Sequence, residues 1–193
     1  FKVFQLLLNE LPESSTLFFG NSTPIRYSNL IPLSKNKPFE VYANRGVSGI
    51  DGVLSTSIGG SMIRPDRKHL CFIGDISFFY DSNAWWNQYI GPNFKCILFN
   101  NQGGNIFKII PGPDQLPEVE TFFETSHQLN SKPIAELYNL QYYRVGQMES
   151  LLTVWKQFLN DDSGKPCLLE INTPSESSNY LRQYFATIRN LDA

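Results

Sequence analysis

The residues of this chain best suited to chemistry lie at the two ends of one stretch, "GDISFFYDSNAWWNQYIGPNFKCILFNNQGGNIF", residues 74–107. Asp75 stands at one end, and Asn101 and Gly103 stand at the other. A hard divalent cation such as Mg²⁺ takes oxygen ligands, usually one or two carboxylates with carbonyl, water and phosphate oxygens. A carboxylate, an amide oxygen and a backbone carbonyl would supply half of such a shell, and a diphosphate could supply the rest.

Each of these residues also has an ordinary structural interpretation. Asp75 follows an apolar run and begins a segment of helical spacing, which is typical of a helix N-cap. Asn101, Gly103 and Gly104 are typical of a loop in which Asn and Gly adopt positive φ. The chemical interpretation gains weight only if the two ends of the stretch meet in space.

Short apolar runs alternate with segments of helical spacing along the whole chain. The predicted strands cover 16–20, 39–44, 70–75, 95–101, 142–146 and 167–173, and the predicted helices cover 22–30, 51–63, 75–90, 133–140, 148–160 and 175–190. This alternation predicts an α/β fold with a mainly parallel sheet and helices on both faces. Because no change of composition divides the chain, we expect residues 1–193 to form a single domain.

The predicted strand ends indicate where a ligand would bind. Four strands run into small polar residues or glycine, in "FFGNST", "YANRGVSG", "FIGDIS" and "LFNNQGG". In open parallel sheets, ligands bind beyond the carboxyl ends of the strands, so we expect the site at this edge. The proline-containing segment 111–132 is expected to form a lid-like loop. The chain contains neither a P-loop nor a dinucleotide-binding glycine fingerprint.

Charge and hydropathy exclude other classes of function. The 16 basic and 18 acidic residues are scattered along the chain, which gives no footprint for nucleic acid or an anionic membrane. The uncharged, glycine-rich stretch 52–63 is too short to span a bilayer, so we expect a cytoplasmic protein without a membrane span. The chain begins with Phe on an amphipathic run, which suggests a piece of a longer protein.

The cysteines and histidines suggest no metal cluster. Cys71, Cys96 and Cys167 each lie inside an apolar run, so we expect reduced, buried thiols. The two histidines are far apart in the sequence, and we expect His69 at the surface or an edge. The sequence gives no reason to assign a role to His127.

The Gly-Asp pair and the Asn-Asn pair, with 25 residues between Asp75 and Asn101, resemble the cofactor motif of thiamin diphosphate-dependent enzymes. The third motif position is Ile76, where many such enzymes have Gly. With "GNSTPIR" and "NRGVSGIDGVLSTSIG", the chain is similar to the C-terminal, diphosphate-binding domain of the 2-succinyl-5-enolpyruvyl-6-hydroxy-3-cyclohexene-1-carboxylate synthase family of menaquinone biosynthesis. The resemblance covers essentially the whole chain, and its specific motifs lie within residues 20–107.

The resemblance implies a thiamin diphosphate-binding fold and a role for each matching residue. Asp75, the Asn101 side chain and the Gly103 carbonyl would hold Mg²⁺ or Mn²⁺. The remaining residues expected to bind the cofactor are Ser48, Ile50, Gly74, Ser77, Ile106 and Phe107. Among these, Ile50 would wedge beneath the cofactor, Ile106 and Phe107 would form an apolar wall, and Ser77 would either meet the diphosphate or cap its own helix.

The family's substrates, 2-oxoglutarate and isochorismate, are dicarboxylic acids, so the resemblance also implies a site for carboxylates. Arg26 and Arg45 would bind them through paired guanidinium hydrogen bonds, and Ser22 would add a hydroxyl. The implied reaction removes CO₂ from 2-oxoglutarate and joins the remaining succinyl group to isochorismate. The cofactor-activating Glu of the family lies in an N-terminal domain of a partner subunit of a homodimer or homotetramer. We therefore expect this chain by itself to be inactive.

Two alternatives remain open. The chain could belong to another thiamin diphosphate enzyme, such as an acetolactate synthase or a 2-oxo acid decarboxylase, although "NRGVSGID" and Arg26 favour the synthase family. It could also be a non-catalytic, doubly wound binding module in which Asp75 and Asn101 only cap and turn the chain.

Overall fold

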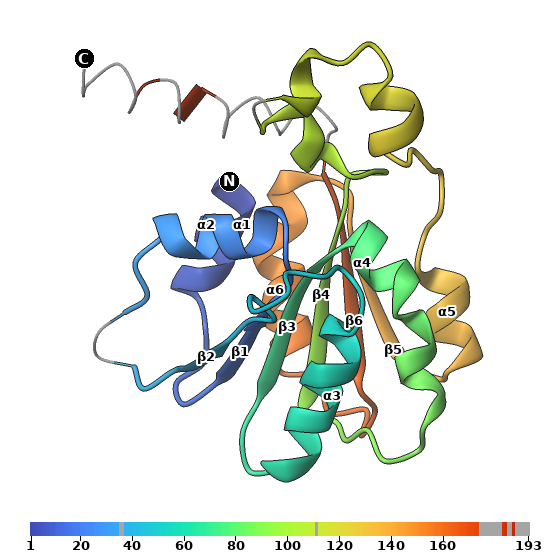
Figure 1. The fold of residues 1–193 in the computed structure, drawn as a ribbon. Coiled ribbons are helices and arrows are strands. Elements are labelled where there is room, and N and C mark those ends of the chain that lie inside the picture. The colour runs from blue at the N-terminus through green and yellow to red at the C-terminus, as the bar shows by residue number, and fades with distance from the viewer. Residues whose placement is uncertain (35–36, 111, 174–182, 185–186, 188–193) are drawn as a thin grey trace.

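The fold is built on a single parallel sheet. The structure, a computed structural model, describes residues 1–34, 37–110, 112–173, 183, 184 and 187. Its six strands are β1 (Thr16–Phe19), β2 (Glu40–Tyr42), β3 (His69–Gly74), β4 (Phe94–Asn100), β5 (Gln141–Val145) and β6 (Cys167–Asn172), in the order β2-β1-β3-β4-β6-β5 (Figure 1). Every neighbouring pair is parallel. The predicted α/β fold is confirmed, whereas a single domain over residues 1–193 stays a prediction.

Helices cover both faces of the sheet because alternate strand residues point to opposite sides. In β3, Leu70 and Phe72 join the core beneath α1 (Lys2–Asn9), α2 (Thr23–Leu30) and α6 (Leu151–Leu159). Cys71 and Ile73 join the core beneath α3 (Val53–Ile63), α4 (Asp75–Tyr80) and α5 (Lys132–Leu137) (Figure 1). The three cysteines are free and buried, as expected.

The predicted helix over 75–90 was wrong in its length. The helix α4 ends at Tyr80 and a 3-10 helix, Ser82–Trp86, follows it. The residue between them, Asp81, turns its carboxylate toward α3, where it accepts the Ser55 backbone N–H at 2.8 Å and the Ser55 hydroxyl at 2.5 Å. Asp81 therefore satisfies a free N–H in the first turn of another helix, which the local pattern of its own segment does not reveal.

Three further expectations need comment. His69 is only 1 % exposed, because β3 lies between β1 and β4, so its expected place at the surface was wrong. The expected loop over 111–132 contains a 3-10 helix, Pro113–Gln115, and a π-helix, Val119–Phe123. Most of the predicted helix 175–190 lies outside the described residues.

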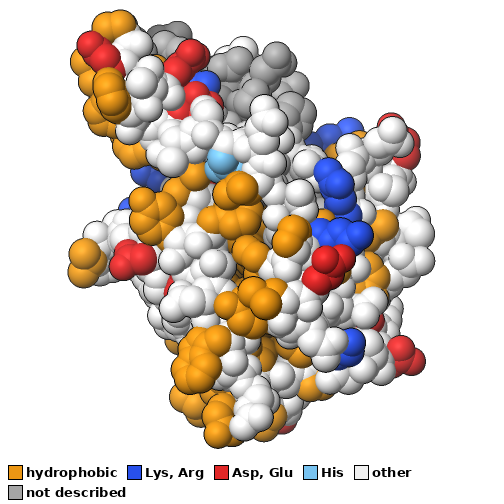
Figure 2. Space-filling view, turned by 90° about the vertical axis from the view of Figure 1, so that its right-hand side faces the viewer, with side chains coloured by type: hydrophobic (Ala, Val, Ile, Leu, Met, Phe, Trp, Pro, Cys, Tyr) orange, Lys and Arg blue, Asp and Glu red, His pale blue; other side chains and the backbone are white. Residues whose placement is uncertain are grey.

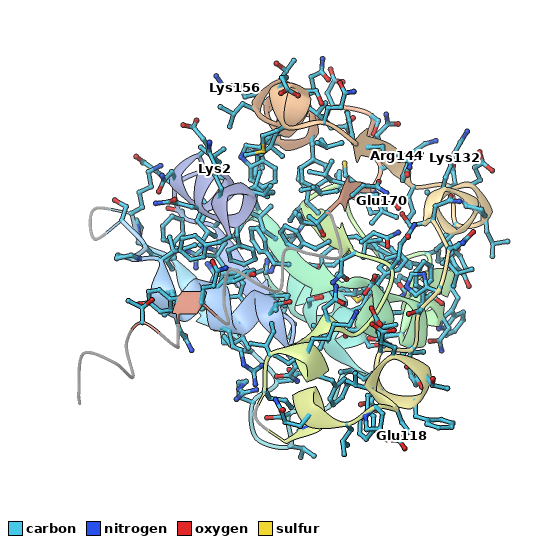
Figure 3. All side chains as sticks on the ribbon, turned by 90° about the horizontal axis from the view of Figure 1, so that it is seen from above. Lys2, Glu118, Lys132, Arg144, Lys156 and Glu170 are labelled. Carbon is cyan, nitrogen blue, oxygen red and sulfur yellow. The ribbon has the colours of Figure 1, made fainter. Side chains whose placement is uncertain are left out.

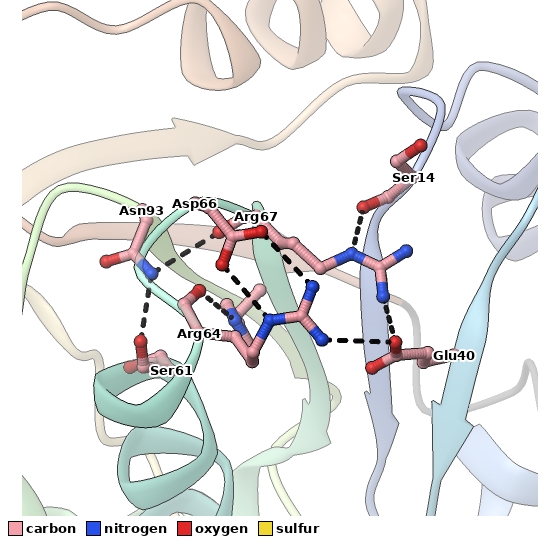
Figure 4. Close-up of polar contacts among 8 residues, drawn as sticks. Ser14, Glu40, Ser61, Arg64, Asp66, Arg67 and Asn93 are labelled. Atoms are coloured by element: carbon pink, nitrogen blue, oxygen red, sulfur yellow. Dashed lines mark hydrogen bonds and ion pairs between the residues drawn. The ribbon is translucent and has the colours of Figure 1, made fainter.

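Charged side chains help to hold the amino-terminal edge of the sheet together. Arg67 donates to the Ser14 carbonyl at 2.8 Å, to the Pro38 carbonyl at 3.3 Å and to the Glu40 carboxylate (Figure 4). Its side chain is 12 % exposed. Arg64 pairs with Asp66 at 3.1 Å and with the same Glu40 carboxylate at 3.6 Å, and its side chain is 48 % exposed. Arg67 therefore joins the short edge strand β2 to the turn before β1.

We expect Arg67→Ala to lower the free energy of unfolding by about 2 kcal/mol, because it removes three charged hydrogen bonds made by a side chain that is mostly buried. Urea unfolding measures this loss, and hydrogen exchange of the amides in Glu40–Tyr42 should accelerate. Arg64→Ala is the matched control and should change stability little, because its ion pairs with Asp66 and Glu40 are both exposed. Equal losses for the two variants would contradict the assignment.

Candidate functional site

A cleft opens at the carboxyl edge of the sheet, between the ends of β1 and β3. The helix that follows β1, α2, packs on one face of the sheet, and the helix that follows β3, α4, packs on the other. Ligands bind at such a divergence in doubly wound sheets. The cleft has a volume of about 1130 Å³. The predicted site residues that line it are Ser22, Ile50, Gly74, Asp75, Ser77, Asn101, Gly103, Ile106 and Phe107.

Asp75 is buried, with only 2 % of the residue exposed, and its carboxylate joins the ends of β3 and β4. Its Oδ1 accepts the Ile76 N–H at 2.8 Å, and its Oδ2 accepts the N–H groups of Asn101 at 3.1 Å and Gly103 at 3.0 Å. The N-cap position of α4 is Gly74, so Asp75 is the first residue of the helix rather than its cap. Burial raises the pKa of Asp75, and the hydrogen bonds from the three N–H groups oppose that shift.

The three residues predicted to hold a metal ion converge. One end of the Asn101 side-chain amide lies 3.0 Å from the Gly103 carbonyl oxygen and 3.1 Å from Asp75 Oδ2. The amide's orientation is assigned from its neighbours. With nitrogen at this end, the amide donates to both acceptors; with oxygen, three oxygens of the types that Mg²⁺ prefers surround one point. The donor set therefore fits the predicted metal.

The glycines of the loop after β4 do not adopt the positive φ that was expected of them. The positive φ falls on Gln102, at 64°, rather than on Asn101, Gly103 or Gly104. A Cβ added to Gly103 would lie 3.1 Å from the Glu124 carbonyl oxygen, and one added to Gly104 would lie 3.3 Å from it. Both positions thus need glycine because another segment approaches closely.

Ser77 fixes the loop between β2 and α3, which contains Ile50, against the first turn of α4. Its hydroxyl donates to the Ile50 carbonyl, so it does not cap its own helix. Ser77 also lines the cleft. Ile50 is held in the cleft wall by this bond. Ser48 is exposed, does not line the cleft and donates to the Arg45 carbonyl at 3.1 Å. The structure therefore places Ile50 and Ser77, but not Ser48, where a cofactor could touch them.

The two predicted substrate arginines lie beside the cleft rather than in its lining. Arg26 donates to the Ser22 carbonyl at 2.8 Å, and Arg45 donates to Asn21 Oδ1 at 3.3 Å. Burial, and then the like charge of Arg45, lower the pKa of Arg26. Ser22 stands at the N-cap of α2 with φ 72° and makes no capping hydrogen bond through its hydroxyl.

The residue that organises this end of the cleft, Asn21, was missed from the sequence. It is 4 % exposed, and its amide donates to the Asn44 carbonyl at 2.9 Å and to the Gly49 carbonyl. Asn21 thus fixes the loop after β2 to the end of β1. Its position directly after "FFG" was the available signal.

The apolar wall comes from a single 3-10 helix, Asn105–Lys108. Ile106 and Phe107 belong to it and line the cleft, as predicted. The Phe107 ring packs against Phe123 of the π-helix, with ring centroids 5.5 Å apart. The wall therefore depends on the segment that the sequence indicated only as a loop.

Glu170, in the interior of the sheet, was also missed. It is 0 % exposed, and Figure 3 shows it inside the ring of helices, whereas Lys2, Lys132 and Lys156 lie at the periphery. Its carboxylate accepts the Asn100 amide at 2.8 Å, the Ser131 N–H at 2.9 Å, the Ser131 hydroxyl at 2.6 Å and the Tyr142 hydroxyl at 2.8 Å. The contact with Asn100 places this network next to the predicted metal ligand Asn101.

Comparison with known proteins identifies the family. A sequence model described as "Thiamine pyrophosphate enzyme, C-terminal TPP binding domain" matches residues 26–171. The chain belongs to this family. The family resemblance, the thiamin diphosphate-binding fold and thiamin diphosphate as the cofactor are thereby confirmed. The individual residue assignments stay predictions.

Curated relatives show which enzymes of this family the chain is similar to. The chain is 45 % identical over 185 residues to 2-succinyl-5-enolpyruvyl-6-hydroxy-3-cyclohexene-1-carboxylate synthase of Christiangramia forsetii. The aligned residues make up 95 % of this chain and 31 % of the relative. The chain is 43 % identical over 186 residues to the synthase of the same name from Flavobacterium johnsoniae, covering 96 % of this chain and 33 % of the relative. The chain thus spans about a third of the length of these relatives.

In the part of the chain that the structure describes, no three His, Cys, Asp or Glu side chains are grouped so that they could hold a metal ion. None of the described helices has the length and apolar character needed to cross a membrane.

The hydrogen bonds to Glu170 predict an acid-sensitive contribution to stability. Burial by itself would raise the pKa of Glu170, but the donors of Ser131, Asn100 and Tyr142 outweigh it and hold the pKa below its ordinary value of 4.5. A group with a lowered folded pKa stabilises the protein fully above its unfolded pKa, and this contribution is lost as the pH falls through the folded pKa.

We therefore expect Glu170→Gln to lower the free energy of unfolding at pH 7 by about 2 kcal/mol, because an amide cannot accept all four hydrogen bonds. The difference from wild type should shrink as the pH falls from about 5 toward 3. Denaturant midpoints across this pH range measure it. A difference that is constant with pH would contradict the assigned protonation state.

Proposed function

We propose that this chain is the cofactor-binding domain of a synthase that decarboxylates 2-oxoglutarate and adds the succinyl group to isochorismate in menaquinone biosynthesis. The observation that supports this most is the convergence of Asp75, Asn101 and the Gly103 carbonyl at one cleft. The similarity to curated synthases over nearly the whole chain supports the choice of reaction. The whole protein would be an enzyme of the carboligase type.

Within this proposal, Asp75, Asn101 and Gly103 would hold Mg²⁺ or Mn²⁺, which would neutralise the charge of the cofactor's diphosphate. Gly74 and Ser77, at the start of α4, line the cleft beside these residues and would contact the diphosphate. Ile50, Ile106 and Phe107 supply the apolar surface that fixes the cofactor rings and excludes water. Thiamin diphosphate supplies the electron sink for the decarboxylation and the carbon–carbon bond formation.

The arginines are proposed to bind the carboxylates of the substrates. Arg26 and Arg45 are close enough for the charge of Arg45 to lower the pKa of Arg26. A carboxylate between two guanidinium groups relieves such repulsion and accepts paired hydrogen bonds from each. The hydroxyl of Ser22, which makes no capping bond, is free to add a donor at the same end of the cleft.

The complete active site is proposed to need a second subunit of a homodimer or homotetramer, whose N-terminal domain carries the activating Glu. Figure 2 shows hydrophobic side chains gathered in a column on the face formed by α4, the 3-10 helix after it and α5. Tyr80, Trp86, Tyr89 and Leu137 are each more than 60 % exposed in this region. Such a surface suits a partner domain. Three free cysteines suit the reducing cytoplasm as its location.

We expect the full-length protein to consume 2-oxoglutarate and isochorismate only when thiamin diphosphate and Mg²⁺ are present. Asp75→Ala should lower kcat/KM at least about 100-fold, because it removes the carboxylate ligand of the metal. Product formation and CO₂ release measure this. Asp66→Ala, at the opposite edge of the sheet, is the matched control and should leave the rate unchanged. Residues 1–193 alone should form no product.

Other outcomes of this experiment select another function. Turnover of pyruvate in place of both substrates would indicate an acetolactate synthase or a decarboxylase. No Mg²⁺-dependent binding of thiamin diphosphate, with Asp75→Ala altering stability alone, would indicate a non-catalytic binding module.

Arg26→Ala and Arg45→Ala should each raise the KM of a dicarboxylic substrate about 10- to 100-fold, because each removes a charged hydrogen bond. Affinity for thiamin diphosphate and Mg²⁺ should stay at the wild-type value, since neither arginine lines the cleft at the metal-binding residues. Lysine at either position should restore only part of the loss, because it cannot donate a planar pair of bonds. A parallel fall in cofactor affinity would contradict the assignment.

A further inference from the structure

Residues 124–127, which we call the strap, lie against the loop that carries two of the proposed metal ligands. The Glu124 carbonyl accepts the Gly104 N–H at 2.5 Å, and the His127 N–H donates to the Gln102 carbonyl at 3.1 Å. Two main-chain hydrogen bonds therefore join the strap to residues 102–104. The Glu124 side chain is buried and accepts Lys108 Nζ at 2.8 Å, which fixes the start of the strap to the 3-10 helix beside the cleft.

The close approach of the strap explains the doubled glycine of "NNQGG". Side chains at Gly103 and Gly104 would meet the Glu124 carbonyl, and one at Gly103 would also lie 3.0 Å from the Glu124 Cγ. The loop and the strap thus have complementary shapes, so the position of the loop depends on the strap as well as on β4.

The His127 ring is the part of the strap that contacts the proposed metal site. Its Nδ1 accepts the Leu129 N–H at 3.1 Å, so in the neutral ring the proton is on Nε2. Nε2 is buried and lies 3.3 Å from Asp75 Oδ2. The pair is within ion-pair distance but falls outside hydrogen-bond geometry, so the contact is chiefly electrostatic. The ring edge also packs on Phe79 of α4, with centroids 5.3 Å apart.

We propose that His127 is a positioning residue of the metal site: its ring, held by Leu129 and Phe79, fixes the Asp75 carboxylate in the orientation that a metal ion needs. This inference rests on the proposed function. Asp75 Oδ2 is the oxygen that faces Asn101 and Gly103, so a group that limits its rotation also keeps the three ligands together. Groups that orient a metal ligand typically change metal affinity 10- to 100-fold when they are removed.

Two substitutions separate positioning from packing. His127→Phe keeps a ring to pack on Phe79 but removes the nitrogen that faces Asp75. His127→Gln removes the ring but keeps an N–H donor of similar reach. The exposed neighbour Gln128, changed to Ala, is the matched control. Each variant of the full-length protein is titrated with Mg²⁺ in the presence of thiamin diphosphate by calorimetry, and its melting temperature is measured without either ligand.

We expect His127→Phe to weaken Mg²⁺ binding about 10-fold or more, with a melting temperature close to that of wild type, and His127→Gln to recover most of the affinity. Gln128→Ala should bind as wild type does. Unchanged Mg²⁺ affinity in His127→Phe overturns the inference, as does a His127→Gln variant that binds as weakly as His127→Phe. A wild-type protein that binds no Mg²⁺ with thiamin diphosphate overturns the proposed function, and the inference with it.

Discussion

The buried carboxylate of Asp75 is the constraint on which the rest of the site depends. A charge at 2 % exposure is costly to desolvate, and three backbone N–H groups at 2.8 to 3.1 Å offset part of that cost. Two of these donors belong to the loop after β4, so the carboxylate keeps its hydrogen bonds only while that loop holds its shape. The ends of β3 and β4 are therefore fixed relative to each other, and together they form one defined wall of the cleft.

A second buried carboxylate extends this constraint across the sheet. Glu170 of β6 holds Asn100, whose side chain also donates to the Leu129 carbonyl at 2.9 Å and accepts the Gln102 N–H at 3.1 Å. The two asparagines of "NNQGG" thus have separate tasks. Asn100 ties the loop to β6 and to the segment after the strap, while Asn101 stands beside Asp75. An amide at both positions is useful because it donates and accepts at once.

The strands, the two helical layers and the ligand edge were predictable because they depend on local patterns: apolar runs, helical spacing and polar strand ends. The contacts that complete the site were not, because they join residues far apart in the sequence. Glu170 lies 70 residues from Asn100, and nothing in "CLLEIN" distinguishes its carboxylate from an exposed one. The length of α4 could not be predicted either, since Asp81 ends it by binding Ser55 of another helix.

The two ends of the cleft favour ligands of opposite charge. At one end, the Asp75 carboxylate and the Gly103 carbonyl present oxygen atoms to the same end of the Asn101 amide, which favours a cation. At the other, burial and the charge of Arg45 lower the pKa of Arg26, which means that this end is already costly for positive charge and gains from an anion. A ligand set with a cation at one end and an anion at the other would suit both ends at once. The sheet holds the two ends apart because they follow different strands, β1 and β3, whose helices leave toward opposite faces. The side chains supply the opposite charge preferences of the two ends of the cleft, and the fold sets the separation between them.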